Sequence, residues 1–65
     1  MMTREQFDSV MYRTLVAMGD PTYSPNHTEW DEEYEKMKNL SFESFDKLCQ
    51  SGVLMYNQSN NSLNN

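Results

Sequence analysis

The sequence predicts an all-α protein, a small domain of three short helices over residues 1–56 followed by a disordered, Asn-rich tail over residues 57–65. Apolar residues recur at spacings of three and four, which is the period of one helix face. Residues that favour helix starts and stops separate the apolar runs from one another. A chain of 65 residues forms one domain at most, and so short a chain buries only about 60% of its unfolded surface.

The first predicted helix begins after Thr3 and ends before Gly19. Thr3 and Gln6 have the spacing of a capping box, in which each side chain bonds the other residue's backbone N–H. Gly19 can adopt the left-handed conformation that closes a helix, and Pro21 prevents the helix from resuming. The apolar stripe of this helix comprises Phe7, Val10, Met11, Leu15 and Met18.

The second predicted helix begins near Thr28, which is a candidate N-cap. Its first turn is rich in acidic residues, which suit the positive end of a helix dipole. Trp30, Tyr34 and Met37 form its apolar stripe, with Leu40 nearby.

The third predicted helix is capped by Ser41 and ends at Gly52. Its apolar side comprises Phe42, Phe45, Leu48 and Cys49. Four apolar residues follow at 53–56, and five of the nine residues in 57–65 are Asn, which favours turns over helix interiors. We therefore expect a mobile tail there, and a core made of Phe7, Met11, Leu15, Trp30, Tyr34, Met37, Phe45 and Leu48.

Residues 20–31 place oxygen-bearing side chains at the spacing of an EF-hand calcium loop. The chemistry of the loop is wrong for calcium, however. Thr22 and Ser24 are neutral where acids are needed, and Pro25 stands where the loop requires a glycine. Asp31 is also one methylene shorter than the usual Glu. The sequence therefore predicts a polar connection and no metal ligands, although a degenerate, metal-responsive EF-hand remains an alternative.

No set of catalytic residues is visible in the sequence. Cys49 and His27 are the sole cysteine and histidine, and Cys49 lies on an apolar stripe, where a buried and inert thiol is expected. No third orienting group or glycine-rich loop accompanies the pair. We therefore expect no enzyme activity and no cofactor.

Charge and composition limit the classes of partner and the cellular compartment that we expect for this chain. The net charge is −5 and the five basic residues are scattered, which disfavours direct binding of nucleic acid or of anionic membranes. No stretch approaches the roughly 20 apolar residues of a membrane span. The charged start of the chain does not resemble a signal peptide. A single cysteine fits a reducing compartment, so we expect a cytoplasmic protein.

Tyr12 and Val16 lie one turn apart and away from the apolar stripe of the first helix. Exposed apolar residues with a polar rim often mark a binding surface, so this pair is a candidate surface for a partner or a homodimer. The alternative is that residues 53–56 fold back and cover it. Met55 is a further candidate contact, since methionine adapts to varied partners.

The run at residues 29–35 is strongly acidic. Asp31, Glu32 and Glu35 point broadly away from Trp30 and form an acidic face. A charge run of this kind is commonly a solvated helix surface. Alternatively, these carboxylates dock on a basic groove in place of nucleic acid, although the run is short for such a mimic.

The sequence thus favours a small acidic helical interaction protein that binds a larger protein and modulates or inhibits it. Accessory proteins of viruses and phages offer an analogy. The alternatives are an acidic nucleic-acid mimic that blocks a DNA- or RNA-binding enzyme and the metal-responsive switch. Salt dependence distinguishes the interaction protein from the nucleic-acid mimic. Binding by a mimic should weaken steeply with ionic strength, and binding through an apolar surface should not.

Overall fold

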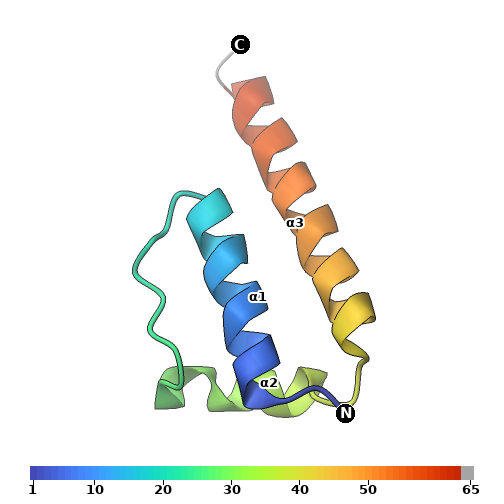
Figure 1. The fold of residues 1–65 in the computed structure, drawn as a ribbon. Helices are drawn as coiled ribbons and strands as arrows, with labels where there is room; N and C mark the ends of the chain where they lie inside the picture. The colour runs from blue at the N-terminus through green and yellow to red at the C-terminus, as the bar shows by residue number, and fades with distance from the viewer. Residues whose placement is uncertain (64–65) are drawn as a thin grey trace.

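The computed structural model describes the backbone of residues 1–63 and the side chains of residues 1–59. Within the described backbone there are three α-helices, one short 3₁₀ helix and no strand, which confirms the predicted all-α, three-helix fold. In Figure 1, α1 and α3 run side by side in the same direction, and α2 crosses beneath them. The elements are α1 (Arg4–Ala17), η1 (Thr28–Trp30), α2 (Asp31–Met37) and α3 (Phe42–Leu63).

Both ends of α1 are closed as the sequence predicts. The Gln6 backbone N–H donates to Thr3 Oγ1 at 3.1 Å, and the Thr3 N–H donates to Gln6 Oε1 at 3.0 Å, which completes the capping box. Gly19 has a φ of 85°, and the N–H of Asp20 donates to the Leu15 carbonyl at 2.8 Å. This is the glycine-terminated helix end that releases the chain into the connection 18–27.

The start of the second helix differs from the prediction. Thr28 is not the N-cap, because His27 has the extended backbone of a capping residue and its imidazole Nδ1 accepts from the Glu29 N–H at 3.1 Å. The first turn is the 3₁₀ helix η1, and α2 follows at Asp31 without a side-chain cap. A histidine can cap a helix because a neutral imidazole has one accepting nitrogen.

Ser41 caps α3 as predicted, with its Oγ accepting from the Ser44 N–H at 3.1 Å. The predicted end at Gly52 is wrong, since Gly52 lies inside a helix that continues to Leu63. A glycine ends a helix only where the chain turns left-handed, and the apolar residues after Gly52 support the helix instead. The backbone is thus helical over 57–63, where a tail was predicted. The disorder of that tail stays a prediction, and residues 64–65 lie outside the described residues.

The core lies at the end of the molecule where all three α-helices meet (Figure 1). The Phe7 ring stacks on Phe45 and meets the edge of Tyr34, each at a centroid distance of 5.4 Å. The fully buried members of this cluster are Met2, Phe7, Val10 and Phe45, and partly buried residues packed against them are Met11, Trp30, Tyr34, Met37 and Cys49.

Several core assignments change. Val10, outside the predicted core, is fully buried, and Leu15, which was predicted there, is only partly buried and lies outside the cluster. Met2 was not predicted, but its N–H donates to the Lys38 carbonyl at 2.9 Å, and its own carbonyl accepts from the Tyr34 hydroxyl at 2.8 Å. These bonds hold the extended residue over the core. Leu48 was predicted in the core but is 54% exposed, because Phe45 and Cys49 occupy the side of α3 that faces α1.

Within residues 1–63, no helix combines the length and the apolar character that a bilayer span requires.

Candidate functional site

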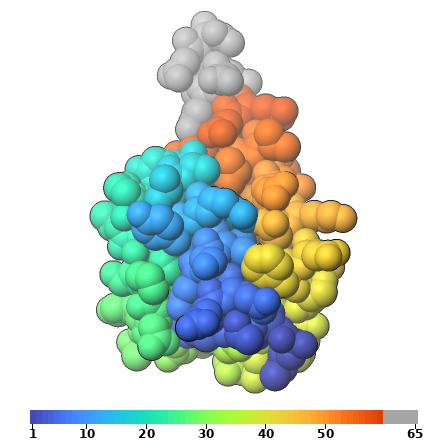
Figure 2. Space-filling view, in the orientation of Figure 1, coloured from blue at the N-terminus to red at the C-terminus, as the bar shows by residue number. Residues whose placement is uncertain are grey.

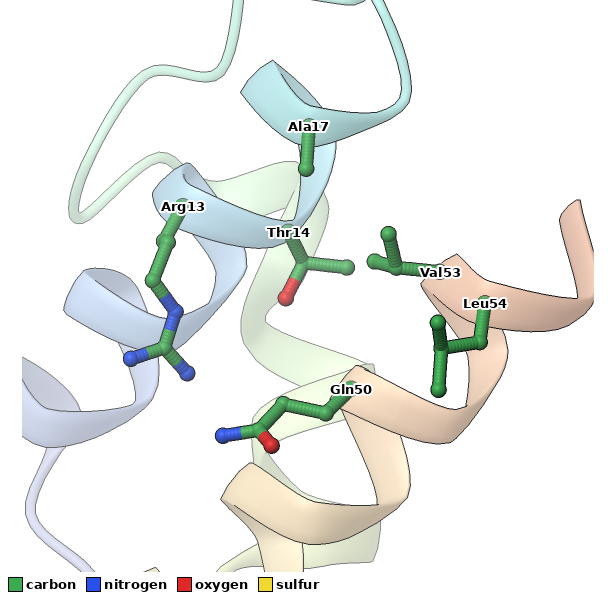
Figure 3. A pocket seen from close by; sticks show the side chains of 6 residues that line it. All are labelled: Arg13, Thr14, Ala17, Gln50, Val53 and Leu54. Atoms are coloured by element: carbon green, nitrogen blue, oxygen red, sulfur yellow. The ribbon is translucent and has the colours of Figure 1, made fainter. Parts of the chain in front are cut away.

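An apolar groove lies between the last turns of α1 and the middle of α3 (Figure 3). Its volume is about 330 Å³. The lining residues are Arg13, Thr14 and Ala17 from α1, and Gln50, Val53 and Leu54 from α3. The groove is therefore built by two helices that run in parallel.

The groove exists because α1 presents small side chains where α3 presents larger ones. The Thr14 hydroxyl donates to the Val10 carbonyl at 2.6 Å, and this bond leaves the methyl group pointing toward Val53 (Figure 3). Ala17, one turn on, adds only a methyl group. Leu54 is 63% exposed, so its side chain forms an open apolar wall.

An ion pair between Arg13 and Asp46 joins α1 to α3 beside the groove. The pair is partly exposed, with the aspartate more buried than the arginine. With Gln50, it gives the apolar surface a polar rim. An apolar pocket with a few polar groups around it is the common form of a binding site for a side chain or small ligand.

A second cluster, which we call the Arg4–Asp8 network, holds the connection 18–27 against α1. The buried Asp8 carboxylate accepts from the Tyr23 hydroxyl at 2.6 Å, the Asn26 N–H at 3.0 Å and Arg4 Nε at 3.1 Å. Burial, together with the bond to Asp8, raises the pKa of Tyr23 well above its ordinary value. These three bonds tie the connection 18–27 to α1 through the Asp8 carboxylate.

Arg4 extends this network to the second helix. Its guanidinium donates to Asp31 Oδ1 at 2.7 Å and to the His27 carbonyl at 2.8 Å. It also lies 5.6 Å from the ring centroids of Phe7 and Tyr34, within cation–π range. The bond to Asp31, then that to Asp8, raises the pKa of Arg4.

The predicted acidic face is only partly available. Asp31 pairs with Arg4 at 2.7 Å, and Glu35 pairs with Lys38 at 2.5 Å. Glu32 is exposed on the same helix. Two of the three carboxylates therefore face cations of their own chain, which reduces the negative field that a nucleic-acid mimic would need.

The residues predicted to make apolar partner contacts lie on α1 and α3, whereas the predicted acidic face lies on α2. Tyr12 borders an open hollow of about 560 Å³, whose other lining residues are Glu5, Asp8, Ser9 and Pro25. Val16 is exposed one turn further along α1. Met55 is 69% exposed on α3. Residues 53–56 belong to the continuous helix α3, and both Tyr12 and Val16 remain exposed beside it.

The connection 20–31 uses its polar side chains for local bonds. Asp20 Oδ1 accepts from the Thr22 hydroxyl at 2.6 Å and from its N–H at 3.2 Å, and these bonds lower the pKa of Asp20. The left-handed residue is Asn26, with a φ of 60°, and not the position that an EF-hand loop reserves for glycine. Among the described residues, no three His, Cys, Asp or Glu side chains are grouped to hold a metal ion.

Cys49 is half-buried against the core, and this burial raises the pKa of its thiol. A protonated thiol is a poor nucleophile. His27, the other residue considered for catalysis, caps η1 through Nδ1. Each of the two side chains thus has a structural role where it lies.

Comparison with known proteins gives no match: no protein-family model fits the chain, and neither a curated protein nor a solved structure is significantly similar to it. The geometry of the chain therefore carries the functional proposal.

Proposed function

We propose that this chain is a small acidic helical interaction protein that binds a larger protein through the groove between α1 and α3, and modulates or inhibits that partner. The observation that carries the proposal is the open apolar groove itself, with Leu54 63% exposed along one wall. Contiguous exposed apolar surface with a polar rim is characteristic of interaction sites.

The groove fits an apolar side chain carried on a helix. Its walls are two helices, and laying a third helix along such a groove is a common mode of peptide recognition. The Arg13–Asp46 pair balances its own charges at the rim, whereas the whole chain carries a net charge of −5. We therefore propose a partner segment with an apolar anchor and basic flanking residues, since opposite charge speeds association.

This proposal replaces the Tyr12 and Val16 surface as the leading site. The groove brings Ala17, Val53 and Leu54 together, whereas the hollow that Tyr12 borders is lined also by Glu5, Asp8 and Ser9. The free thiol of Cys49 is consistent with action in the cytoplasm. Blocking a nucleic-acid-binding enzyme by mimicry gains no support from the paired carboxylates of α2, and inhibition in the manner of a viral or phage accessory protein stays part of the proposal.

The test is a capture experiment with the native host extract, using wild type and two variants. Ala17→Leu fills the groove with a residue that helices accept, so the fold is kept while the anchor is excluded. The double change Tyr12→Ser, Val16→Ser removes the other apolar pair. We expect the captured partner to be lost with Ala17→Leu and retained with the double variant. The reverse pattern, at equal helicity by circular dichroism, would move the site to Tyr12 and Val16.

A further inference from the structure

His27 lies at the junction where the connection 18–27 enters η1, and it makes hydrogen bonds in both directions. Its backbone carbonyl accepts from Arg4 Nη2 of α1 at 2.8 Å. Its imidazole Nδ1 accepts from the Glu29 N–H at 3.1 Å, which caps the helix start. The backbone bond is independent of pH, whereas the imidazole bond depends on the state of the ring.

The bond to Nδ1 exists only while the imidazole is neutral. A neutral imidazole has one accepting nitrogen, and a protonated one has none, because both nitrogens then carry a hydrogen. Protonation of His27 therefore sets a ring N–H against the Glu29 N–H in place of a bond. The positive charge is also opposed by the dipole of η1 and α2, whose positive end lies at this start. A charged His27 cannot act as the cap.

The charged groups around the junction do not pair with the ring. They are Arg4 and Asp8 of α1, Glu29 of η1 and Asp31 of α2. Asp8 and Asp31 both bond Arg4, at 3.1 and 2.7 Å, and Glu29 is exposed. Among the described side chains, no carboxylate forms an ion pair with His27. The described bonds therefore hold the neutral ring and do not hold a charged one.

The junction is open to solvent, so its protonation follows the pH of the surroundings. His27 is exposed. Figure 2 shows the green segment around residues 25–30 at the outer edge of the molecule, beside the blue start of α1. His27 is also the sole histidine of the chain, and histidine is the side chain that ordinarily gains its proton between about pH 8 and pH 5. A change at this junction within that range is therefore expected mainly from His27.

We propose that His27 is a pH-sensitive switch, which closes the junction between the connection 18–27 and η1 when its ring is neutral and opens it when the ring is protonated. Protonation removes the side-chain cap of η1, and α2 has no side-chain cap of its own. The neutral ring is bonded in the folded chain and not in the unfolded chain. The contribution of the cap to stability is thus complete at the upper end of the histidine range and is lost as the pH falls.

Opening of the junction reaches the core through Trp30, the last residue of η1. Its N–H donates to the His27 carbonyl at 3.1 Å, so the 3₁₀ turn that His27 caps also positions the indole. The indole packs against the core cluster, and its ring centroid lies 5.1 Å from that of Tyr23. Loss of the cap therefore loosens the start of the second helix and one contact of the connection together.

Urea melts of three full-length chains at about pH 8 and about pH 5 test the switch. His27→Asn keeps a cap that does not titrate, because asparagine is a strong N-cap residue, and His27→Ala has no cap at either pH. At the higher pH we expect wild type and H27N to share an advantage over H27A. At the lower pH the ratio of folded to unfolded wild type should fall about fivefold relative to H27N, to the level of H27A. All other titrating groups are common to the three chains and cancel in this comparison.

Two outcomes of the melts overturn the proposal. One is a stability of wild type relative to H27N that is the same at both pH values. The other is equal stability of H27N and H27A at the higher pH, because the cap then contributes nothing.

Amide hydrogen exchange measures the junction directly. The protection of the Glu29 N–H, relative to its intrinsic exchange rate at each pH, should fall in wild type between the higher and the lower pH and stay constant in H27N. Protection that changes equally in the two chains contradicts the switch. Groove binding enters neither measurement, so the outcome is independent of the proposed function.

Discussion

The two ends of this molecule differ sharply in how they are held. At one end, α1, α2 and the start of α3 enclose a core of aromatic and methionine side chains, and the Arg4–Asp8 network binds the long connection to it. At the other end, α3 stands largely alone, with Leu54 and Met55 more than half exposed and no charged residue after Lys47. The contrast shows that the fold is held mainly at one end of the molecule, and we propose that binding uses the other end.

A division of this kind has a physical reason. The core of a domain this small supplies about 3–5 kcal/mol of stability. Its core residues are therefore needed for folding and are not available to form a binding surface. Four apolar side chains in the uncharged half of α3 are exposed, namely Leu48, Leu54, Met55 and Tyr56. We propose that part of this surface meets a partner.

The largest expected effect is the loss of stability when Phe45, near the start of α3, is truncated. Truncation of Met55, in the second half of the same helix, is the comparison. Phe45 is 3% exposed between the helices, so Phe45→Ala should cost about 3–5 kcal/mol and leave the chain largely unfolded by circular dichroism. Met55→Ala, on the same helix, should change the free energy of unfolding by less than about 0.5 kcal/mol. If both variants lose similar stability, the exposed half of α3 belongs to the folding core and the division fails.

A smaller effect is expected from the polar network. Asp8→Ala removes a buried carboxylate that accepts from Arg4, Tyr23 and Asn26, and should lower the free energy of unfolding by about 2–3 kcal/mol. Asp31→Ala removes a carboxylate that is 59% exposed and bonded to the same Arg4, so its cost should stay below about 1 kcal/mol. Urea melts of the two variants measure the difference. A larger loss with Asp31→Ala would show that α2, and not the connection, is the main element that Arg4 and Asp8 hold.

The smallest effect concerns the buried Tyr23 hydroxyl and depends on pH. Burial raises the pKa of Tyr23 above the ordinary 10.0, so its neutral form is favoured in the folded chain. The resulting stability is fully present below pH 10 and is lost as pH rises further, because the unfolded chain ionises first. Tyr23→Phe should cost about 1 kcal/mol at neutral pH and should flatten the loss of melting temperature above pH 10. Tyr12→Phe, at an exposed position, is the control and should leave the alkaline profile as in wild type.

Local chemistry along the sequence determined much of this protein. The capping box at Thr3 and Gln6, the Gly19 terminator and the Ser41 cap depend on neighbours a few residues away, so each could be identified from spacing alone. The helical stripes likewise placed Phe7 and Phe45 in the core. The exposure of Tyr12 and Val16 also followed from their position on a helix.

Tertiary structure alone decided the rest, because the deciding contacts join distant parts of the chain. Gly52 ends no helix, since no left-handed turn follows it, and Leu48 leaves the core because α1 meets another side of α3. Asp8 is bonded by Tyr23 and Asn26 from the connection 18–27, and helix spacing could not show that these residues return to meet it. The groove likewise required Thr14 and Ala17 to lie beside Val53 and Leu54, a juxtaposition set by the parallel packing of two helices separated by the whole of α2.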